Sequence, residues 1–148
     1  MKIIKHLGHS VIPVFIGGMI YIIYRPDSLI MFNWFKSLGL LNYINELRKS
    51  FNYPISQLVI YNLPNGFWCY SITYLMIVIW KNKITKQSFL WIFSGLFIGI
   101  FTEFAQLFHF IKGTFDFVDI IVMLVFSIIG FLHLNTKNHD YKAQIITT

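Results

Sequence analysis

The sequence predicts an all-α integral membrane protein, a bundle of four transmembrane helices with one amphipathic helix in the extracytoplasmic membrane interface. Of its 148 residues, 56% are hydrophobic and 19% aromatic, whereas only 12% are charged. Mean hydropathy is +0.63. A soluble domain of this length needs far more polar surface, and the charged residues lie mostly between apolar blocks. We therefore expect residues 1–148 to form a single membrane domain.

The first predicted span covers residues 6–24 and ends before Arg25 and Pro26. Its position resembles that of a signal peptide, but bulky residues follow it where a cleavage site would need small ones, so we expect an uncleaved helix. The second predicted span covers residues 64–80, and Pro64 suits a first helical turn. Because this span is shorter than the roughly 20 residues of a full crossing, we expect it to begin in the headgroup region.

The segment between these spans, residues 28–51, is too polar to cross a bilayer and too apolar for a free loop. Its apolar residues recur at helical spacing with asparagine, lysine and arginine between them, and Gly39 interrupts the pattern. This periodicity is typical of an amphipathic helix that lies in the membrane interface, broken near the glycine.

The third and fourth predicted spans cover residues 87–111 and 116–134. The loop between them is so short that the two helices must be antiparallel neighbours.

Topology follows from the lysine and arginine residues near the span ends. With four spans, both termini share one side with the loop at 81–86, and this side carries Lys2, Lys5, Lys81, Lys83, Lys86, Lys137 and Lys142. We therefore expect both termini to be cytoplasmic and residues 28–51 to lie outside. The formal charge of +6 is explained by topology and contact with anionic lipid, so we expect no nucleic-acid partner.

Four polar residues interrupt the apolar third and fourth spans. Glu103 and Gln106 are three residues apart and share a helical face, and the hairpin brings them opposite Asp116 and Asp119. A carboxylate in hydrocarbon costs at least about 2–3 kcal/mol, so such groups are usually paired and functional. Lys112 is the nearest basic residue. We take these five residues as the candidate ligand-binding site.

Each acid has a structural alternative that the sequence leaves open. Glu103 is either a protonated residue bonded to a neighbouring helix or the floor of an outward-open polar pocket. Asp116 and Asp119 before an apolar run are typical of a capped helix start, and a cap can still contribute to a pocket. Three close carboxylates cannot all ionise cheaply, and Gln106 has the donor and acceptor needed to bridge two acids.

Other chemistries have little support. A metal site built from the three acids and His109 matches no recognised ligand spacing, so we expect no metal and no cofactor. Cys69 is the only cysteine and is expected to be a small buried hydrophobe. The remaining histidines lie at predicted span ends and are expected to be interfacial: His6, His9, His133 and His139. No nucleophile or phosphate-binding loop is found, so no catalytic residue is assigned.

The order of these motifs points to a family. Glu103-x-x-Gln106 lies on one helix, Phe115-Asp116-x-x-Asp119-Ile120 opens the next, and Gly130 follows. Between about residues 95 and 130 the chain resembles the VanZ-like family of bacterial membrane proteins, which is named for a teicoplanin-resistance protein.

The chain departs from the family at two positions. Members often carry an arginine shortly before the first aspartate and an asparagine one turn after the second. Here Lys112, Gly113 and Thr114 precede Asp116, and Met123 occupies the later position. A lysine does not reproduce the bidentate clamp of an arginine, so we expect a divergent member.

The resemblance implies association with the bacterial cytoplasmic membrane and cell envelope without supplying a reaction. Our first hypothesis is a non-enzymatic protein whose outward-facing polar pocket binds a lipid-linked or amphiphilic ligand and affects glycopeptide or lipoglycopeptide susceptibility. Its partners would be membrane lipids and that ligand. The first alternative is an intramembrane enzyme acting on a lipid-linked substrate, with Glu103 as general acid and an aspartate as base. The second is a small proton-coupled carrier, which would have to dimerise because the chain has no internal repeat.

Overall fold

The computed structural model describes the backbone of residues 2–51 and 53–146 and the side chains of residues 6–51 and 53–133. This part of the chain holds eight α-helices and no strand, which confirms the all-α prediction. The helices are α1 (Lys2–Tyr24), α2 (Ile30–Ser37), α3 (Leu41–Ser50), α4 (Gln57–Tyr61), α5 (Leu63–Ile79), α6 (Lys86–Ile92), α7 (Ser94–Leu107) and α8 (Phe117–Ile146). The charges of Lys2, Lys5, Lys137 and Lys142, which the topology prediction uses, lie outside the described side chains.

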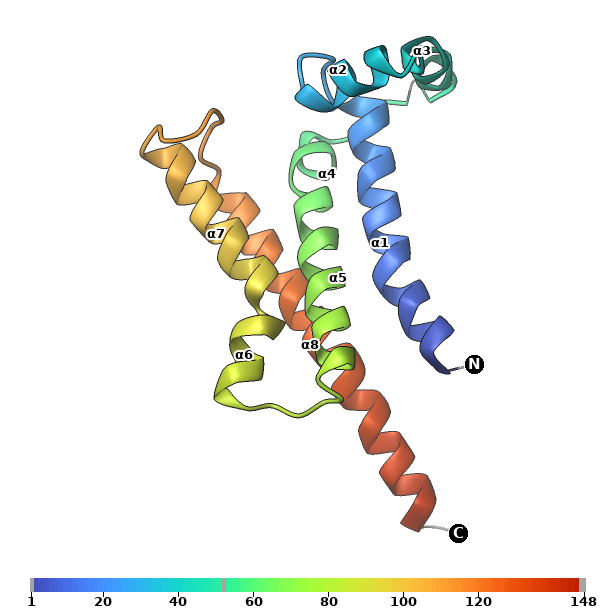
Figure 1. Cartoon of the computed structure of the whole chain (residues 1–148), viewed down its shortest axis with the longest axis vertical. Helices are drawn as coiled ribbons and strands as arrows, with labels where there is room; N and C mark the ends of the chain where they lie inside the picture. Colours follow the sequence, from blue (N-terminus) through green and yellow to red (C-terminus); the bar gives the residue numbers. More distant parts are fainter. Residues whose placement is uncertain (1, 52, 147–148) are drawn as a thin grey trace.

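Helix α5 is the centre of the molecule. It packs against α1, α4, α6, α7 and α8. Helices α2 and α3 lie across the end of α1 where α5 begins, whereas α1 begins and α8 ends at the opposite end (Figure 1). The bundle therefore has two distinct ends, one covered by α2 and α3 and one formed by the two terminal helices.

Glycines bring α5 and α8 into close contact. A Cβ atom on Gly66 of α5 would lie 2.8 Å from side-chain atoms of Phe126 and Val122 on α8. A Cβ atom on Gly130 of α8 would lie 2.8 Å from the backbone carbonyl oxygen of Tyr70. Small residues at such positions let two helix backbones approach closely, which increases van der Waals contact along the pair.

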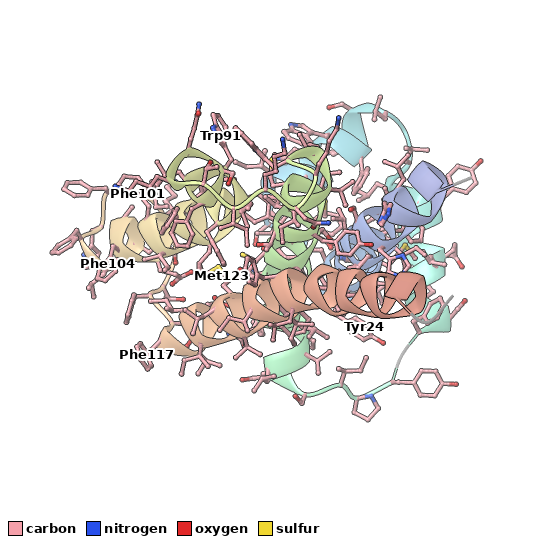
Figure 2. All side chains as sticks on the ribbon, turned by 90° about the horizontal axis from the view of Figure 1, so that it is seen from below. Tyr24, Trp91, Phe101, Phe104, Phe117 and Met123 are labelled. Atoms are coloured by element: carbon pink, nitrogen blue, oxygen red, sulfur yellow. The ribbon has the colours of Figure 1, made fainter. Side chains whose placement is uncertain are left out.

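The interior between α5, α7 and α8 is built around sulfur-containing side chains. Cys69 is fully buried and packs with Leu96 and Met123, which confirms its prediction as a small buried hydrophobe. Met123 lies against Gly99 of α7. Figure 2 shows Met123 between the helices, whereas Phe101 points away from the bundle and is 74% exposed.

The third predicted span, residues 87–111, is not one helix. Helices α6 and α7 meet at Phe93 with a bend of 58°. Gly95, just after the bend, lies against Ile72 of α5, where a Cβ atom would be 3.2 Å away, so the start of α7 approaches α5 closely. Helix α7 ends at Leu107 because His109 takes a positive φ of 59° and turns the chain.

The predicted amphipathic segment forms two helices. Gly39, with φ of +70°, separates α2 from α3, which confirms the predicted break. Arg48 of α3 donates to the carbonyl oxygens of Ile22 and Arg25 at 2.7 and 2.6 Å and forms an ion pair with Asp27. A cation on the carbonyls of a last helical turn is favourable, so Arg48 attaches α3 to the end of α1. The short helix α4 was not predicted.

Among the residues that the structure describes, one helix is long and apolar enough to cross a membrane. It is the His6–Tyr24 part of α1, and only 11% of its apolar window is buried, so the protein itself does not cover this surface. An N-terminal signal sequence has the same length and hydropathy. The bent pair α6 and α7 provides a second span if it crosses as one unit, whereas α5, with 17 residues, and the Phe117–His133 part of α8 are shorter.

The α5–α8 contact makes a first prediction. Gly130→Ala should lower the free energy of unfolding by about 1–3 kcal/mol, because the backbone of Tyr70 cannot move away as a flexible side chain would. Gly18→Ala on α1 is the matched control: nothing lies within 4 Å of its added Cβ, so it should be neutral or stabilising by about 0.5–1 kcal/mol. Both variants are compared by their thermal unfolding midpoints in the same detergent. Equal midpoints would contradict the close contact between Gly130 and Tyr70.

Candidate functional site

A cluster of carboxylates and amides joins the first turns of α5 and α8 to α7. We call it the carboxylate–amide cluster; its members are Asn62, Asn65, Glu103, Asp116 and Asp119. Asn62 Nδ2 donates to Asp116 Oδ2 at 3.1 Å and to Asp119 Oδ1 at 2.9 Å. Asn65 Nδ2 donates to the same Asp119 oxygen at 3.0 Å. Two amides at the start of α5 therefore hold both aspartates at the start of α8.

Glu103 connects α7 to the same cluster. Its Oε2 accepts a hydrogen bond from the backbone N–H of Asp116 at 3.0 Å, and the residue is only 5% exposed. Asp116 Oδ1 accepts from the backbone N–H of Val118 at 2.8 Å, which confirms the predicted helix cap. Asp116 thus uses one oxygen as a cap and the other to accept from Asn62, and its part in a ligand pocket stays a prediction.

Donors reach both oxygens of Asp116: Asn62 Nδ2 reaches one and the backbone N–H of Val118 the other. No hydrogen bond from the described residues reaches Glu103 Oε1 or Asp119 Oδ2. These two oxygens are carboxylate acceptors that the cluster can still offer to a ligand. Among the residues that the structure describes, no three acid, histidine or cysteine side chains are arranged to hold a metal.

Gln106 and Lys112 do not join the three acids. The side chain of Gln106 packs against Gly113, where a Cβ atom would lie 2.6 Å from its Cδ, and makes no hydrogen bond to either aspartate. Lys112 is exposed and forms no ion pair within the described part of the chain. His109 is exposed as well.

The sequence analysis missed Asn62 and Asn65, which lie 54 or more residues before the aspartates they bind. A local signal exists, because the two amides are three residues apart at the start of a predicted span. The acids of the hairpin are a second signal, because buried carboxylates need donors from elsewhere in the chain.

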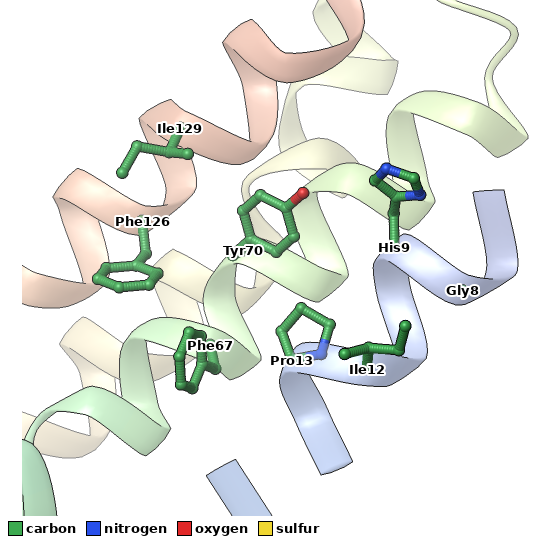
Figure 3. Close-up of a pocket in the computed structure, with 8 residues that line it drawn as sticks. All are labelled: Gly8, His9, Ile12, Pro13, Phe67, Tyr70, Phe126 and Ile129. Carbon is green, nitrogen blue, oxygen red and sulfur yellow. The ribbon is translucent and has the colours of Figure 1, made fainter. Parts of the chain in front are cut away.

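A cleft of about 510 Å³ lies between α1, α5 and α8, away from the carboxylate–amide cluster (Figure 3). Its walls are almost entirely apolar, and its two polar residues are His9 and Tyr70. Figure 3 shows the Tyr70 hydroxyl pointing toward His9. The lining residues are Gly8, His9, Ile12 and Pro13 of α1, Phe67 and Tyr70 of α5, and Phe126 and Ile129 of α8.

The polar end of the cleft continues into a cluster of imidazole and phenol rings, the histidine–tyrosine cluster. His6 Nδ1 and the Tyr74 hydroxyl are 2.9 Å apart, and the Tyr70 hydroxyl and His133 Nδ1 are 2.7 Å apart. The ring of His9 stacks on Tyr74 at 5.5 Å and meets His133 edge-on at 5.0 Å. Three helices thus contribute five rings to one place.

A buried phenol needs an acceptor for its proton. If each tyrosine donates to Nδ1, the histidine rings carry their proton on Nε2 and remain hydrogen-bond donors. The sequence predicted interfacial positions for His6, His9 and His133, which stays a prediction, but it did not predict that the three rings lie together. Their spacing gave a partial signal, because His6 and His9 share one face of α1. His139 lies outside the described side chains.

Comparison of the chain with protein-family models, curated proteins and solved structures finds no match. The resemblance to the VanZ-like family stays a prediction from residues 95–130.

The carboxylate–amide cluster makes the next prediction. Asn62→Leu keeps the branched shape but removes the donor to both aspartates, so it should lower the free energy of unfolding by about 2 kcal/mol. Asn42→Leu, at an exposed position of α3, is the matched control and should cost less than about 0.5 kcal/mol. Denaturant unfolding in a fixed detergent measures both. Similar losses for the two variants would show that the amide bonds contribute nothing specific.

Proposed function

We propose that this chain is a small integral membrane protein of the bacterial envelope that binds an amphiphile, with the apolar chain of the ligand in the cleft between α1, α5 and α8. The observation that carries the proposal is the cleft itself. A volume of about 510 Å³ lies within the ~300–1,000 Å³ of small-molecule sites. Apolar walls with His9 and Tyr70 at one end match a ligand that has a long apolar body and one polar end.

The outward-facing side chains support the proposal that lipid surrounds the protein. Large apolar residues are exposed on every long helix, among them Phe15 of α1, Phe101 of α7 and Phe117 of α8. In water an apolar surface of this extent would drive aggregation, whereas acyl chains solvate it. We propose four crossings, made by α1, α5, the bent pair α6 and α7, and α8.

Helices α2 and α3 suit the membrane interface. Ile30, Trp34 and Leu38 are exposed apolar residues of this segment, and Lys36 lies among them. An amphipathic helix of this composition lies in the headgroup layer with its apolar face toward the acyl chains. With both termini cytoplasmic, α2, α3 and the carboxylate–amide cluster face outward, and the histidine–tyrosine cluster faces the cytoplasmic leaflet.

The carboxylate–amide cluster has a place in this proposal. It holds α5 and α8, two walls of the cleft, at their outer ends. Glu103 and Asp119 would present their remaining oxygens to donors of a headgroup. An effect on susceptibility to teicoplanin and other lipoglycopeptides is the part of the proposal that rests on the VanZ-like resemblance alone.

Orientation is tested by single cysteines in a Cys69→Ser background. Cysteines replacing Lys49 or Lys112 should react with a membrane-impermeant thiol reagent on intact cells, because both positions are exposed at the proposed outer face. A cysteine replacing Asn82 in the α5–α6 loop should react only after the cells are lysed. The reverse pattern would overturn the proposed topology.

Ligand binding is tested by filling the cleft. Ile129 and Ile128 are neighbours on α8 with nearly equal exposure, 46% and 45%, but only Ile129 lines the cleft. In nanodiscs that contain a phospholipid with a photoreactive group in its acyl chain, Ile129→Trp should lower crosslinking to Phe67 and Tyr70 about tenfold, or roughly 1.4 kcal/mol. Ile128→Trp should leave it unchanged.

Mass spectrometry of the crosslinked peptides reads out the result. The proposal predicts adducts concentrated on the cleft residues of α1, α5 and α8. Adducts spread evenly over the exposed faces of α7 and α8, unaffected by Ile129→Trp, would show that the cleft holds no chain.

A further inference from the structure

Arg25, which directly follows α1, carries a positive charge that no acidic side chain among the described residues neutralises. The nearby acid, Asp27, forms its ion pair with Arg48 instead. The guanidinium carbon of Arg25 lies 4.8 Å from the ring centre of Tyr21 and 4.5 Å from that of Tyr61. The cation therefore contacts two aromatic rings and has no counterion from the described chain.

The two neighbouring arginines differ in how their donors are used. Arg48 binds the carbonyl oxygens of Ile22 and Arg25 and the carboxylate of Asp27, so it is a structural residue with protein partners on Nε and on both terminal nitrogens. Arg25 has one long contact, from its NH2 group to the Tyr21 hydroxyl at 3.4 Å. Its Nε is buried and has no partner among the described residues. Arg48 therefore stabilises the end of α1, whereas the positive charge of Arg25 remains available to a group outside the described chain.

The geometry at Arg25 restricts what that group can be. A partly buried cation without a counterion is costly, so the missing partner is an anion. Cation–π contacts with Tyr21 and Tyr61 hold the guanidinium plane in place, which reduces the side-chain entropy lost on binding. The two rings contact the guanidinium, and its N–H groups are free of other acceptors among the described residues apart from the long contact to Tyr21, so parallel N–H groups can match two oxygens of a phosphate or carboxylate.

We propose that Arg25, held by Tyr21 and Tyr61, binds the phosphate group of a phospholipid in the outer leaflet. The end of α1 lies beside α2 and α3 (Figure 1), and exposed Trp34 and Leu38 suit the level of the lipid headgroups. Phosphate is the anion present at that level in every phospholipid. This inference rests on the membrane placement given under the proposed function but not on the cleft, which lies in another part of α1.

The test compares lipid retention by native mass spectrometry after release from nanodiscs. Phosphatidylglycerol and diacylglycerol with the same acyl chains are supplied in equal amounts. The wild-type protein should retain the phosphatidylglycerol in about tenfold preference, and Arg25→Gln should abolish this preference. Lys36→Gln is the matched control, because it removes the same charge from an exposed position on the same face and should leave the preference intact.

Two further measurements distinguish a lipid-phosphate site from a site for free phosphate and from attraction by net charge. Arg25→Lys keeps the charge but not the planar fork, so it should retain only part of the preference. Inorganic phosphate added in excess should not displace the lipid, and displacement would identify free phosphate as the ligand and overturn the proposal. An equal loss in Lys36→Gln and Arg25→Gln would show that net charge alone attracts the lipid, and this outcome also overturns it.

Separate experimental controls test whether Arg25→Gln changes the stability of the fold or ligand binding in the cleft. Unfolding midpoints of Arg25→Gln and the wild type should agree. If they differ, Tyr61→Leu, which keeps the cation but removes one ring, should lower retention several-fold, and unchanged retention would overturn the site. Crosslinking in the cleft should be the same in Arg25→Gln and the wild type, so a failure of the amphiphile proposal and a failure of the phosphate site give different results.

Discussion

The amide of Asn62 determines how the helices of this protein meet. It donates to Asp116 and Asp119 at once, while the backbone N–H of Asp116 donates to Glu103. These bonds join the starts of α5 and α8 to α7 in surroundings where Asn62 is only 4% exposed. In a low dielectric such bonds are strong when they are satisfied and costly when one partner is missing. The register that they set places glycines of each helix opposite bulky groups of the other, so the packing of α5 on α8 depends on this one joint.

The sequence predicted the parts of this joint that lie close together along the chain. The short loop before α8 made Glu103, Asp116 and Asp119 neighbours, and the cap at Asp116 followed from its position before an apolar run. Gly39 could be identified as a break for the same reason, because a glycine within a periodic pattern is a local signal. Features that depend on residues only a few positions apart could therefore be predicted from the sequence.

The features that the sequence did not predict depend on how segments that are far apart in the chain pack together. The donors for the two aspartates come from the start of α5, and hydropathy along the chain carries no information about that pairing. The bend at Phe93 was missed because no proline marks it and the apolar pattern continues through it. Gln106 was expected to bridge the acids, but the close approach of Gly113 occupies its side chain. The histidine–tyrosine cluster needed three helices in place before its members became neighbours.

Three of the proposed crossings consist of a single helix: α1, α5 and α8. The central helix, α5, is the shortest of these three. At 1.5 Å per residue the 17 residues of α5 span about 26 Å, whereas the hydrocarbon of a typical bilayer is ~30 Å thick. Because α5 contacts five other helices, it cannot adjust by changing its own tilt alone. Thinning of the bilayer around α5 is one way to remove this mismatch, at a cost of fractions of a kcal/mol per Å. Regions of a cell where the bilayer is already thin would then be where this protein collects.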